Sequence, residues 1–397
     1  MKVLLINNFH YRKGGSETVY FNTAELLRRN GHEVRFFSFL DEKSEHDGSE
    51  TLVDRPAGKI SGLFSYVNNR SAAARLDALL DEYHPDVAHI HLFWGGLSSS
   101  ILPVLKKHGV RVVHTAHDYR LACPAYLFLN GKVEICEKCR GGKFCNCALG
   151  RCSKGSLLNS LVMTAEMYYR QAFRSPAKYL DGIIYVSEFS KRKHIEMQPS
   201  LADVRSIVLH NFTSLTPSRD CGRGDYFLYM GRLSAEKGIG TMIEAFAGMP
   251  DLRLKIVGDG PLRASMEAIS AEKNASNIEF TGYKSGQELT ELVRNASFLV
   301  IPSQCYENNP MSVIEAFACG KPVIGADIGG IPELVSASGA GFLFSPSDAE
   351  GLKECLEKAA GLSEDEYDEL SERAVEFVAA DSDVNAYAAR LLEFYRG

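Results

Sequence analysis

The 397-residue sequence lacks several features that would place it in a class at once. No apolar stretch approaches the length of a membrane span, no repeat with a period of about 20 to 50 residues is present, and no long segment is of low complexity. The apolar run near the N-terminus, Val3 to Ile6, is too short for the core of a signal peptide and is typical of a first strand. With 45% hydrophobic and 24% charged residues, we expect a globular, cytoplasmic protein of two domains.

The fingerprints of common nucleotide-binding folds are also missing. The segment NNFHYRKGGSETVYF holds Gly14 and Gly15, but its spacing matches neither G-x-G-x-x-G nor a P-loop, which argues against a Rossmann-type oxidoreductase. Two adjacent glycines are more often a simple turn, although they would also let the backbone approach a ligand. No Asp-x-Asp pair follows an expected strand in the second half; Asp381 and Asp383 precede the last expected helix, where capping explains them better.

Short apolar or β-branched runs alternate with amphipathic helical stretches, the pattern of parallel sheets covered by helices. The expected strands are residues 2–6, 33–38, 86–91, 110–115, 182–186 and 206–209 in the first half, and 226–231, 252–258, 278–281, 297–302, 322–325 and 341–344 in the second. Residues 211–225 between the two sets are rich in Ser, Thr, Pro, Gly and Asp, which predicts a linker. The sequence thus predicts an α/β fold of two doubly wound parallel-sheet domains whose ligand-binding crevices face each other across a cleft.

The two halves differ in charge. Residues 1–210 contain 28 Lys and Arg against 21 Asp and Glu, a net charge of +7, whereas the rest contains 16 against 29, a net charge of −13. A basic half suits an anionic partner such as a membrane surface or a phosphorylated acceptor, and solvated charge without a partner explains the asymmetry equally well.

Two strand-to-helix turns in the second half favour phosphate binding. YMGRLSAEKGIG places Arg232 and Lys237 after a strand, where a fork-shaped and a point cation can hold a diphosphate and stabilise the charge that grows on it as it leaves. The alternative is a pair of surface cations. In VGDGP, Gly258 allows a close backbone approach after the next strand.

The segment QCYENNPMSVIEAFACGKPVI predicts a helix that begins at Pro310, is capped by Asn309 and ends at Gly320. Glu315 lies within its apolar run, where a carboxylate needs hydrogen-bond donors such as ligand hydroxyls or, alternatively, a structural arginine. Glu307 lies just before the helix, whose free amides favour an anionic ligand. The pair predicts a site for a ligand with both hydroxyls and negative charge.

Together these residues resemble the retaining nucleotide-sugar glycosyltransferases of family 4, which have the GT-B fold of two Rossmann-like domains. The resemblance extends over nearly the whole chain and rests on Gly14 and Gly15, His117 in HTAHDYR, the GRL and EKG segments, VGDG, and Glu307 and Glu315 with seven residues between them. It implies an acceptor-binding domain at residues 1–210, a nucleotide-sugar-binding domain at 226–380 and a final helix at 381–397 that packs back on one of them.

For the site, the resemblance implies that Arg232 and Lys237 contact the donor diphosphate, that Glu315 binds the ribose hydroxyls and that Glu307 touches the transferred sugar. The further implied contacts on the phosphates and the sugar are the amides at Gly14 and Gly15 on the diphosphate, His117 beside the sugar, the turn at Gly258, and the backbone of Asn308, Asn309, Pro310 and Met311 at sugar and phosphate. Tyr283 and Lys284 are the implied contacts of the base. A histidine with purely structural hydrogen bonds is the alternative for His117.

The implied reaction moves a sugar from a UDP- or GDP-sugar to a hydroxyl of a saccharide or lipid-linked saccharide, in glycan, polysaccharide or glycolipid biosynthesis. No second carboxylate is evident for a double displacement. The resemblance implies retention by a front-face reaction in which the leaving phosphate deprotonates the acceptor, with cations and amides in place of a metal. The alternatives are another GT-B sugar-nucleotide enzyme such as an epimerase, or a non-catalytic zinc-bearing binding protein.

Residues of about 123–155 form a cysteine-rich insertion that is not typical of the family. Cys136 and Cys139 in C-x-x-C spacing, completed by Cys123 and Cys152 or else by Cys145 and Cys147, predict a structural zinc site, with free thiols as an equal alternative. The insertion's cations are interleaved with Glu134 and Glu137, so no nucleic acid is expected. Because it follows His117, the insertion is expected to shape the acceptor pocket.

Residues 157–179 predict a helix that carries Leu, Met, Tyr and Phe together with Arg170, Arg174 and Lys178. Such a face could rest peripherally on the inner face of a membrane, but the pattern is more typical of a helix whose apolar side chains face the core, and we favour that interpretation.

Overall fold

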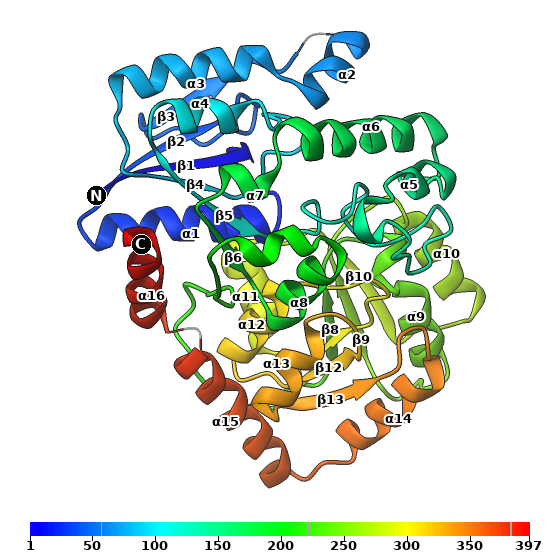
Figure 1. Cartoon of the computed structure of the whole chain (residues 1–397). Coiled ribbons are helices and arrows are strands. Elements are labelled where there is room, and N and C mark those ends of the chain that lie inside the picture. The colour runs from blue at the N-terminus through cyan, green and yellow to red at the C-terminus, as the bar shows by residue number, and fades with distance from the viewer. Residues whose placement is uncertain (57, 221, 382) are drawn as a thin grey trace. The chain divides into compact units, whose positions relative to one another are not determined.

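The computed structural model describes residues 1–56, 58–220, 222–381 and 383–397 (Figure 1). It divides into unit 1, Met1–Leu209 with Val384–Gly397, and unit 2, His210–Asp383. Cys221 of the predicted linker and Ser382 before the final helix lie outside the described residues. The rest of the predicted linker belongs to unit 2, where the Arg223 guanidinium donates hydrogen bonds to the carbonyls of Ala359 and Leu362.

Unit 1 is built on a parallel sheet with the order β3-β2-β1-β4-β5-β6-β7. Its strands are β1 (Lys2–Phe9), β2 (Glu33–Phe39), β3 (Glu50–Val53), β4 (Val87–Ile90), β5 (Arg111–Ala116), β6 (Gly182–Tyr185) and β7 (Ser206–Val208). Val3, Leu4, Leu5 and Ile6 of β1 are all buried, as expected for a central strand that is covered on both faces. The register pairs Ile6 with Ile90 of β4, so the loops that follow these strands leave the sheet at one edge.

The helices of unit 1 are α1 (Gly15–Arg29), α2 (Lys59–Val67), α3 (Arg70–Glu82), α4 (Ile101–Lys107), α5 (Cys145–Leu149), α6 (Leu157–Phe173), α7 (Pro176–Tyr179), α8 (Glu188–Met197) and α16 (Val384–Arg396), with short 3-10 helices η1 (Arg140–Gly142) and η2 (Pro199–Asp203). The final helix α16 is joined to this sheet by the Tyr395 hydroxyl, which lies 2.6 Å from Nδ1 of His89 on β4. None of the described helices is both long and apolar enough to cross a bilayer.

Unit 2 is built on a second parallel sheet with the order β10-β9-β8-β11-β12-β13. Its strands are β8 (Phe227–Met230), β9 (Leu254–Val257), β10 (Ile278–Gly282), β11 (Leu299–Ile301), β12 (Val323–Ala326) and β13 (Gly341–Phe344). Its helices are η3 (Ala235–Lys237), α9 (Ile239–Ala247), α10 (Arg263–Glu272), α11 (Gly286–Arg294), α12 (Met311–Ala318), α13 (Ile331–Ser338), α14 (Ala349–Ala360) and α15 (Glu364–Asp381). Phe246, Phe298 and Ile324 are fully buried in its core.

Each predicted strand occurs in the structure, and the sequence analysis missed only β3 among the strands that the structure describes. β3 has the sequence ETLV and pairs with β2 alone, at the edge of the sheet. Glu50, Thr51 and Leu52 are only partly buried. An edge strand needs no continuous apolar run, so the pattern that revealed the other strands was absent.

The prediction that the apolar side chains of helix 157–179 face the core was wrong. Leu157, Leu158, Leu161 and Phe173 are exposed, whereas Glu166 is buried. The helix also ends earlier than predicted, because α6 stops at Phe173 and the separate α7 begins at Pro176.

Candidate active site

The carboxyl edge of the unit 2 sheet brings together two of the predicted residues. Lys237 ends η3 after β8, and Glu307 lies in the loop between β11 and α12. The Lys237 ammonium donates to Oε1 of Glu307 at 2.5 Å, and the Ser303 hydroxyl donates to the same oxygen at 2.6 Å. Ser303, at the end of β11, is a member of this group that the sequence analysis did not identify. These contacts fix a cation and an anion side by side at the edge where such sheets bind ligands.

Both members of this pair are held in their charged forms. Burial opposes the charge on Lys237, but the negative potential of Glu307 outweighs it, and the pKa of Lys237 is raised. Burial likewise acts against ionised Glu307, yet the charge and hydrogen bond of Lys237 and the bond from Ser303 lower the pKa of Glu307. The side chains retain 27% and 15% exposure, so a ligand can still reach them.

The helix that follows Glu307 begins with an open N-terminus. α12 starts at Met311, and no side chain caps it. The predicted cap by Asn309 is therefore wrong: Oδ1 of Asn309 instead accepts a hydrogen bond from the backbone amide of Asn211 at 2.8 Å. Pro310 occupies the cap position rather than the first helical position. An uncapped N-terminus offers backbone amides and the positive end of the helix dipole to an anion.

Glu315 lies one turn into α12 and is only partly exposed. Burial raises the pKa of Glu315 to about 7. Among the described residues its carboxylate has no hydrogen-bond or ion-pair partner, so the alternative of a structural arginine finds no support. A partly buried carboxylate of this kind is suited to accept hydrogen bonds from a ligand.

Glycines allow the loops at this edge to pack against one another. A Cβ on Gly258 would lie 1.9 Å from the carbonyl oxygen of Gly231, and one on Gly238 would lie 1.8 Å from that of Pro302. The amide of Gly330, after β12, donates to the carbonyl of Glu307 at 2.6 Å. The close approach predicted for Gly258 is therefore made to another loop of the protein, and this packing sets the positions of Lys237 and Glu307.

The other predicted contacts of unit 2 lie on the surface. Arg232 is exposed just after β8, and among the described residues its guanidinium has no hydrogen-bond or ion-pair partner. Tyr283 is 67% exposed, and Lys284 forms an ion pair with Glu288 on α11. Their roles in donor binding stay predictions.

His117 lies at the carboxyl edge of the unit 1 sheet, beside a histidine that the sequence analysis missed. Its Nε2 lies 2.8 Å from Nδ1 of His91, and the two rings stack with centroids 5.1 Å apart. Burial lowers the pKa of His117 to about 3, so the imidazole is neutral near pH 7. His91 follows β4, and its signal in the sequence was its place at a strand end, like that of His117.

The glycine pair lies at the same edge of unit 1. Gly15 is the first residue of α1, and Gly14 precedes it in an extended conformation without a side-chain cap. Glu17 in the first turn of α1 is buried. Burial raises the pKa of Glu17, although hydrogen bonds from Ser16 and Asn7 act to lower it. This edge thus combines neutral histidines and a buried glutamate with the exposed cations Arg12 and Lys13.

Two family models match the chain. Residues 13–216 match the model described as Glycosyltransferase Family 4, and residues 221–377 match that described as Glycosyl transferases group 1. The first match alone covers more than half of the sequence. The chain belongs to glycosyltransferase family 4. The predicted family is thereby confirmed, and the prediction of a glycosyltransferase is confirmed at the level of the family.

Known relatives agree with this assignment. An uncharacterized glycosyltransferase of Methanocaldococcus jannaschii is 31% identical over 196 residues, which are 49% of this chain and 54% of that protein, so the match spans about half of the relative's length. The structure of sucrose-phosphate synthase from Thermosynechococcus elongatus aligns with a TM-score of 0.75 at 21% identity, over 100% of this chain and 98% of that one. Anabaena HepE in complex with UDP and glucose aligns with a TM-score of 0.70 at 16% identity, over 100% of both chains. The predicted GT-B fold is confirmed.

The cysteines of this family-4 chain do not support the predicted zinc site. In the described part of the chain no group of three or more His, Cys, Asp or Glu side chains is arranged to hold a metal ion. The predicted ligands Cys123, Cys136, Cys139 and Cys152 are free thiols.

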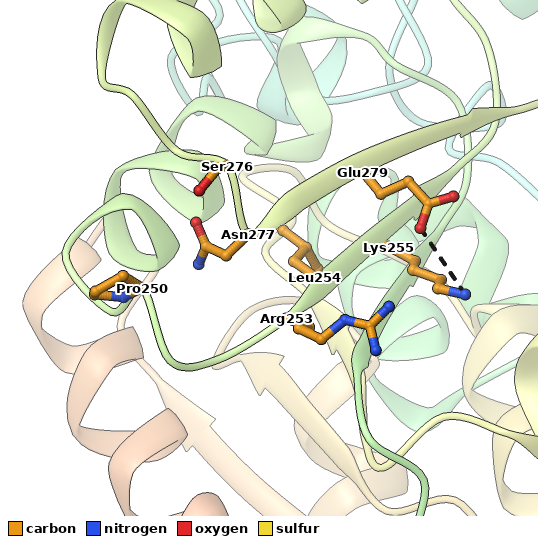
Figure 2. A pocket seen from close by; sticks show the side chains of 7 residues that line it. All are labelled: Pro250, Arg253, Leu254, Lys255, Ser276, Asn277 and Glu279. Carbon is orange, nitrogen blue, oxygen red and sulfur yellow. Dashed lines mark ion pairs between the residues drawn. The ribbon is translucent and has the colours of Figure 1, made fainter.

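A hollow of about 330 Å³ lies elsewhere on unit 2 and takes no part in the candidate site (Figure 2). It is lined by Pro250, Arg253, Leu254, Lys255, Ser276, Asn277 and Glu279. Leu254 is the first residue of β9, so the hollow is at the amino edge of the sheet, whereas Lys237 and Glu307 follow the carboxyl ends. Lys255 and Glu279 form an ion pair there at 3.9 Å, and none of the predicted site residues lines the hollow.

Proposed function

We propose that this family-4 chain transfers a sugar from a nucleoside-diphosphate sugar to an acceptor hydroxyl with retention of configuration, without a catalytic metal. The observation that carries the proposal is the arrangement of Lys237, Glu307 and Glu315 around the open N-terminus of α12. It offers a cation and amides to a diphosphate, and carboxylates to hydroxyls, at the carboxyl edge of the unit 2 sheet.

Each group of the donor has a matching residue in this arrangement. Lys237 and the exposed Arg232 bind the diphosphate with the amides of α12 that follow Pro310, and Glu307 accepts from a hydroxyl of the sugar. Glu315, which has no protein partner among the described residues, accepts from the ribose hydroxyls. Because HepE was solved with UDP and glucose, UDP-glucose is the first donor to test, and GDP-sugars are the second.

The reaction breaks the bond between the anomeric carbon and the diphosphate oxygen and forms a bond from the same carbon to the acceptor oxygen on the same face. The acceptor proton moves to the departing phosphate oxygen. Lys237 and Arg232 stabilise the negative charge that grows on the diphosphate. Glu307 is already bound to Lys237, which holds the ammonium in place for the leaving group.

The acceptor, a saccharide or lipid-linked saccharide, is assigned to the carboxyl edge of unit 1. A neutral His117 can donate or accept one hydrogen bond, which suits a hydroxyl better than a phosphate. Gly14 and Gly15 also belong to unit 1, and their contacts with the diphosphate stay predictions.

The test is a thermal-shift panel of nucleoside diphosphates and their sugars in EDTA, with wild type, Arg232→Ala and Glu315→Ala. One donor should stabilise the wild type selectively, and both variants should lose that stabilisation. Stabilisation that appears only when divalent metal is added would contradict the metal-independent mechanism. Product analysis by NMR then separates transfer from the epimerase alternative, because an epimerase changes the sugar nucleotide without an acceptor.

A further inference from the structure

Exposed apolar side chains gather on three helices of unit 1. Of the twelve large hydrophobic residues that are exposed in the described chain, eight belong to α2, α5 and α6. We call them the α6 patch: Leu63, Phe64, Leu149, Leu157, Leu158, Leu161, Tyr168 and Phe173. Both α2 and α5 pack against α6, and the three helices lie near one another in Figure 1. The residues of the patch therefore come from three helices that pack against one another.

The long helix α6 exposes an apolar face, unlike a typical surface helix. Its residues 158, 161, 165, 168 and 172 recur at intervals of three and four, lie on one face and are Leu, Leu, Ala, Tyr and Ala. All five are exposed. A helix beside water normally shows polar residues on that face.

The polar residues of α6 point inward instead. Glu166 and Arg170 form an ion pair at 3.0 Å, with side chains only 8% and 3% exposed. The Arg170 guanidinium also donates to the carbonyl of Arg120 at 2.9 Å and lies 4.0 Å from the ring centre of Trp94. These contacts fix the rotation of the helix, because turning it to bury the leucines would break the contacts of Arg170 with Arg120 and Trp94 and would expose the buried ion pair.

The segment that contains α5 and α6 is rich in positive charge. Residues 138–180 contain eight cations and a single acid, Glu166, which is buried against Arg170. The cations are Lys138, Arg140, Lys143, Arg151, Lys154, Arg170, Arg174 and Lys178. Arg151 and Lys154 are exposed immediately before α6, and Lys178 is exposed after it. The outward face of α6 is thus apolar, exposed cations border the helix at both ends, and residues 138–180 carry no exposed carboxylate.

We propose that the α6 patch binds the surface of a lipid bilayer that contains anionic headgroups, with the apolar side chains among the acyl chains and the border cations at the phosphates. An apolar face with Leu and Phe, bordered by Lys and Arg, is the composition of helices that lie in the membrane interface. A second copy of the chain fits less well, because face-to-face contact would bring the two cationic borders together. The proposal does not depend on the donor site.

The test is co-sedimentation of the full chain with vesicles of phosphatidylcholine alone and of phosphatidylcholine with phosphatidylglycerol. The variant is Leu158→Ser with Phe173→Ser, since each of these side chains is 69% exposed and its loss should leave the fold intact. The control is Leu40→Ser, which replaces a side chain that is 45% exposed but lies after β2, outside the patch. Circular dichroism and the midpoint of thermal unfolding check that all three proteins are folded.

Wild type should bind the anionic vesicles more tightly than the neutral ones, and added salt should weaken this binding. The double variant should bind the anionic vesicles about tenfold or more weakly, while Leu40→Ser should match the wild type. No sedimentation of wild type with anionic vesicles at low salt would overturn the proposal, and so would equal binding by the double variant. Concentration-dependent dimers that the double variant abolishes, without vesicle binding, would assign the patch to self-association and likewise overturn it.

Discussion

The carboxyl group of Glu315 is largely buried without a partner among the described residues, at a cost in stability. Burial raises the pKa of Glu315 to about 7 from an ordinary value of 4.5, with no partner among the described residues to offset it. A carboxyl whose folded pKa is raised is neutral in both states below the unfolded pKa. As pH rises from the unfolded to the folded pKa, the carboxyl ionises first in the unfolded chain, so the fold loses stability over this range and loses no more above it. The folded protein therefore loses stability between about pH 4.5 and pH 7 through this residue.

Replacing Glu315 with glutamine should remove this cost. We expect Glu315→Gln to be more stable than wild type by about 1 to 3 kcal/mol at pH 8 and nearly equal to it at pH 4.5, as measured by thermal unfolding at both pH values. The same variant should bind the nucleotide more weakly, because an amide accepts less strongly than a carboxylate. A loss of stability at pH 8 would mean that Glu315 has a structural partner.

The ion pair of Lys237 and Glu307 shows what could be predicted at the residue scale. Both residues were found in the sequence by their places at strand and helix ends, but 70 positions separate them, so their direct contact was visible only in the structure. Ser303 and His91 were missed because a single serine or histidine after a strand is an ordinary loop residue. Their importance follows from the atoms that they contact.

At the scale of elements, glycines decide how the loops after β8, β9 and β11 fit together. Gly258 has φ of 139° and would place a Cβ 1.9 Å from the carbonyl oxygen of Gly231, so any side chain there must displace a neighbouring loop. Gly240 in α9 has nothing within 4 Å of its Cβ position. The two glycines therefore allow a matched comparison within one unit.

Gly258→Ala should lower the free energy of unfolding by about 3 kcal/mol or more, because both the backbone conformation and the contact with Gly231 are lost. Gly240→Ala should be neutral or raise stability by about 0.5 to 1 kcal/mol, since alanine favours a helix. Urea denaturation of both variants provides the measurement. If Gly258→Ala had the same free energy of unfolding as wild type, the packing of Gly258 against Gly231 would not be what holds the loops.

Elements with strong periodicity could be predicted, and the direction in which a helix faces could not. The central strands were evident because both faces of a parallel sheet are buried, whereas β3 at the edge carried no such run. The helix α6 was evident as a helix, but its orientation depends on the buried contact between Arg170 and Trp94, which are far apart in the sequence. The same limit applies to α12, where Asn309 hydrogen-bonds to Asn211 instead of capping the helix.

At the scale of the whole molecule, a histidine at the start of unit 2 is linked to the end of the same unit. The imidazole of His210 lies 2.7 Å from the carboxylate of Asp381 and 3.1 Å from that of Glu333. Burial opposes the charge, but these two carboxylates raise the pKa of His210 to about 9. A histidine whose pKa is raised on folding stabilises the fold fully below its unfolded pKa of about 6.5. This contribution is lost as pH rises through the pKa of the folded state.

His210→Gln should therefore lower the stability of unit 2 by about 1 to 3 kcal/mol at pH 6, and the difference from wild type should vanish above pH 9. Calorimetry at pH 6 and at pH 9.5 would show this. His46→Gln is the control, because His46 pairs with Glu50 on the surface and is 59% exposed, so its loss should change little at either pH. An effect of His210→Gln that persists at pH 9.5 would point to packing instead of charge.

The measurement that tests the account most directly is calorimetric titration of UDP and GDP, in EDTA, into wild type, Lys237→Met and Lys353→Met. The two lysines are matched, since each pairs with a glutamate and their side chains are 27% and 26% exposed. We predict that one diphosphate binds wild type without metal, that Lys237→Met weakens this binding about tenfold or more, and that Lys353→Met does not change it. Absence of binding in EDTA, or equal binding by Lys237→Met, would contradict a metal-independent donor site at the carboxyl edge of unit 2.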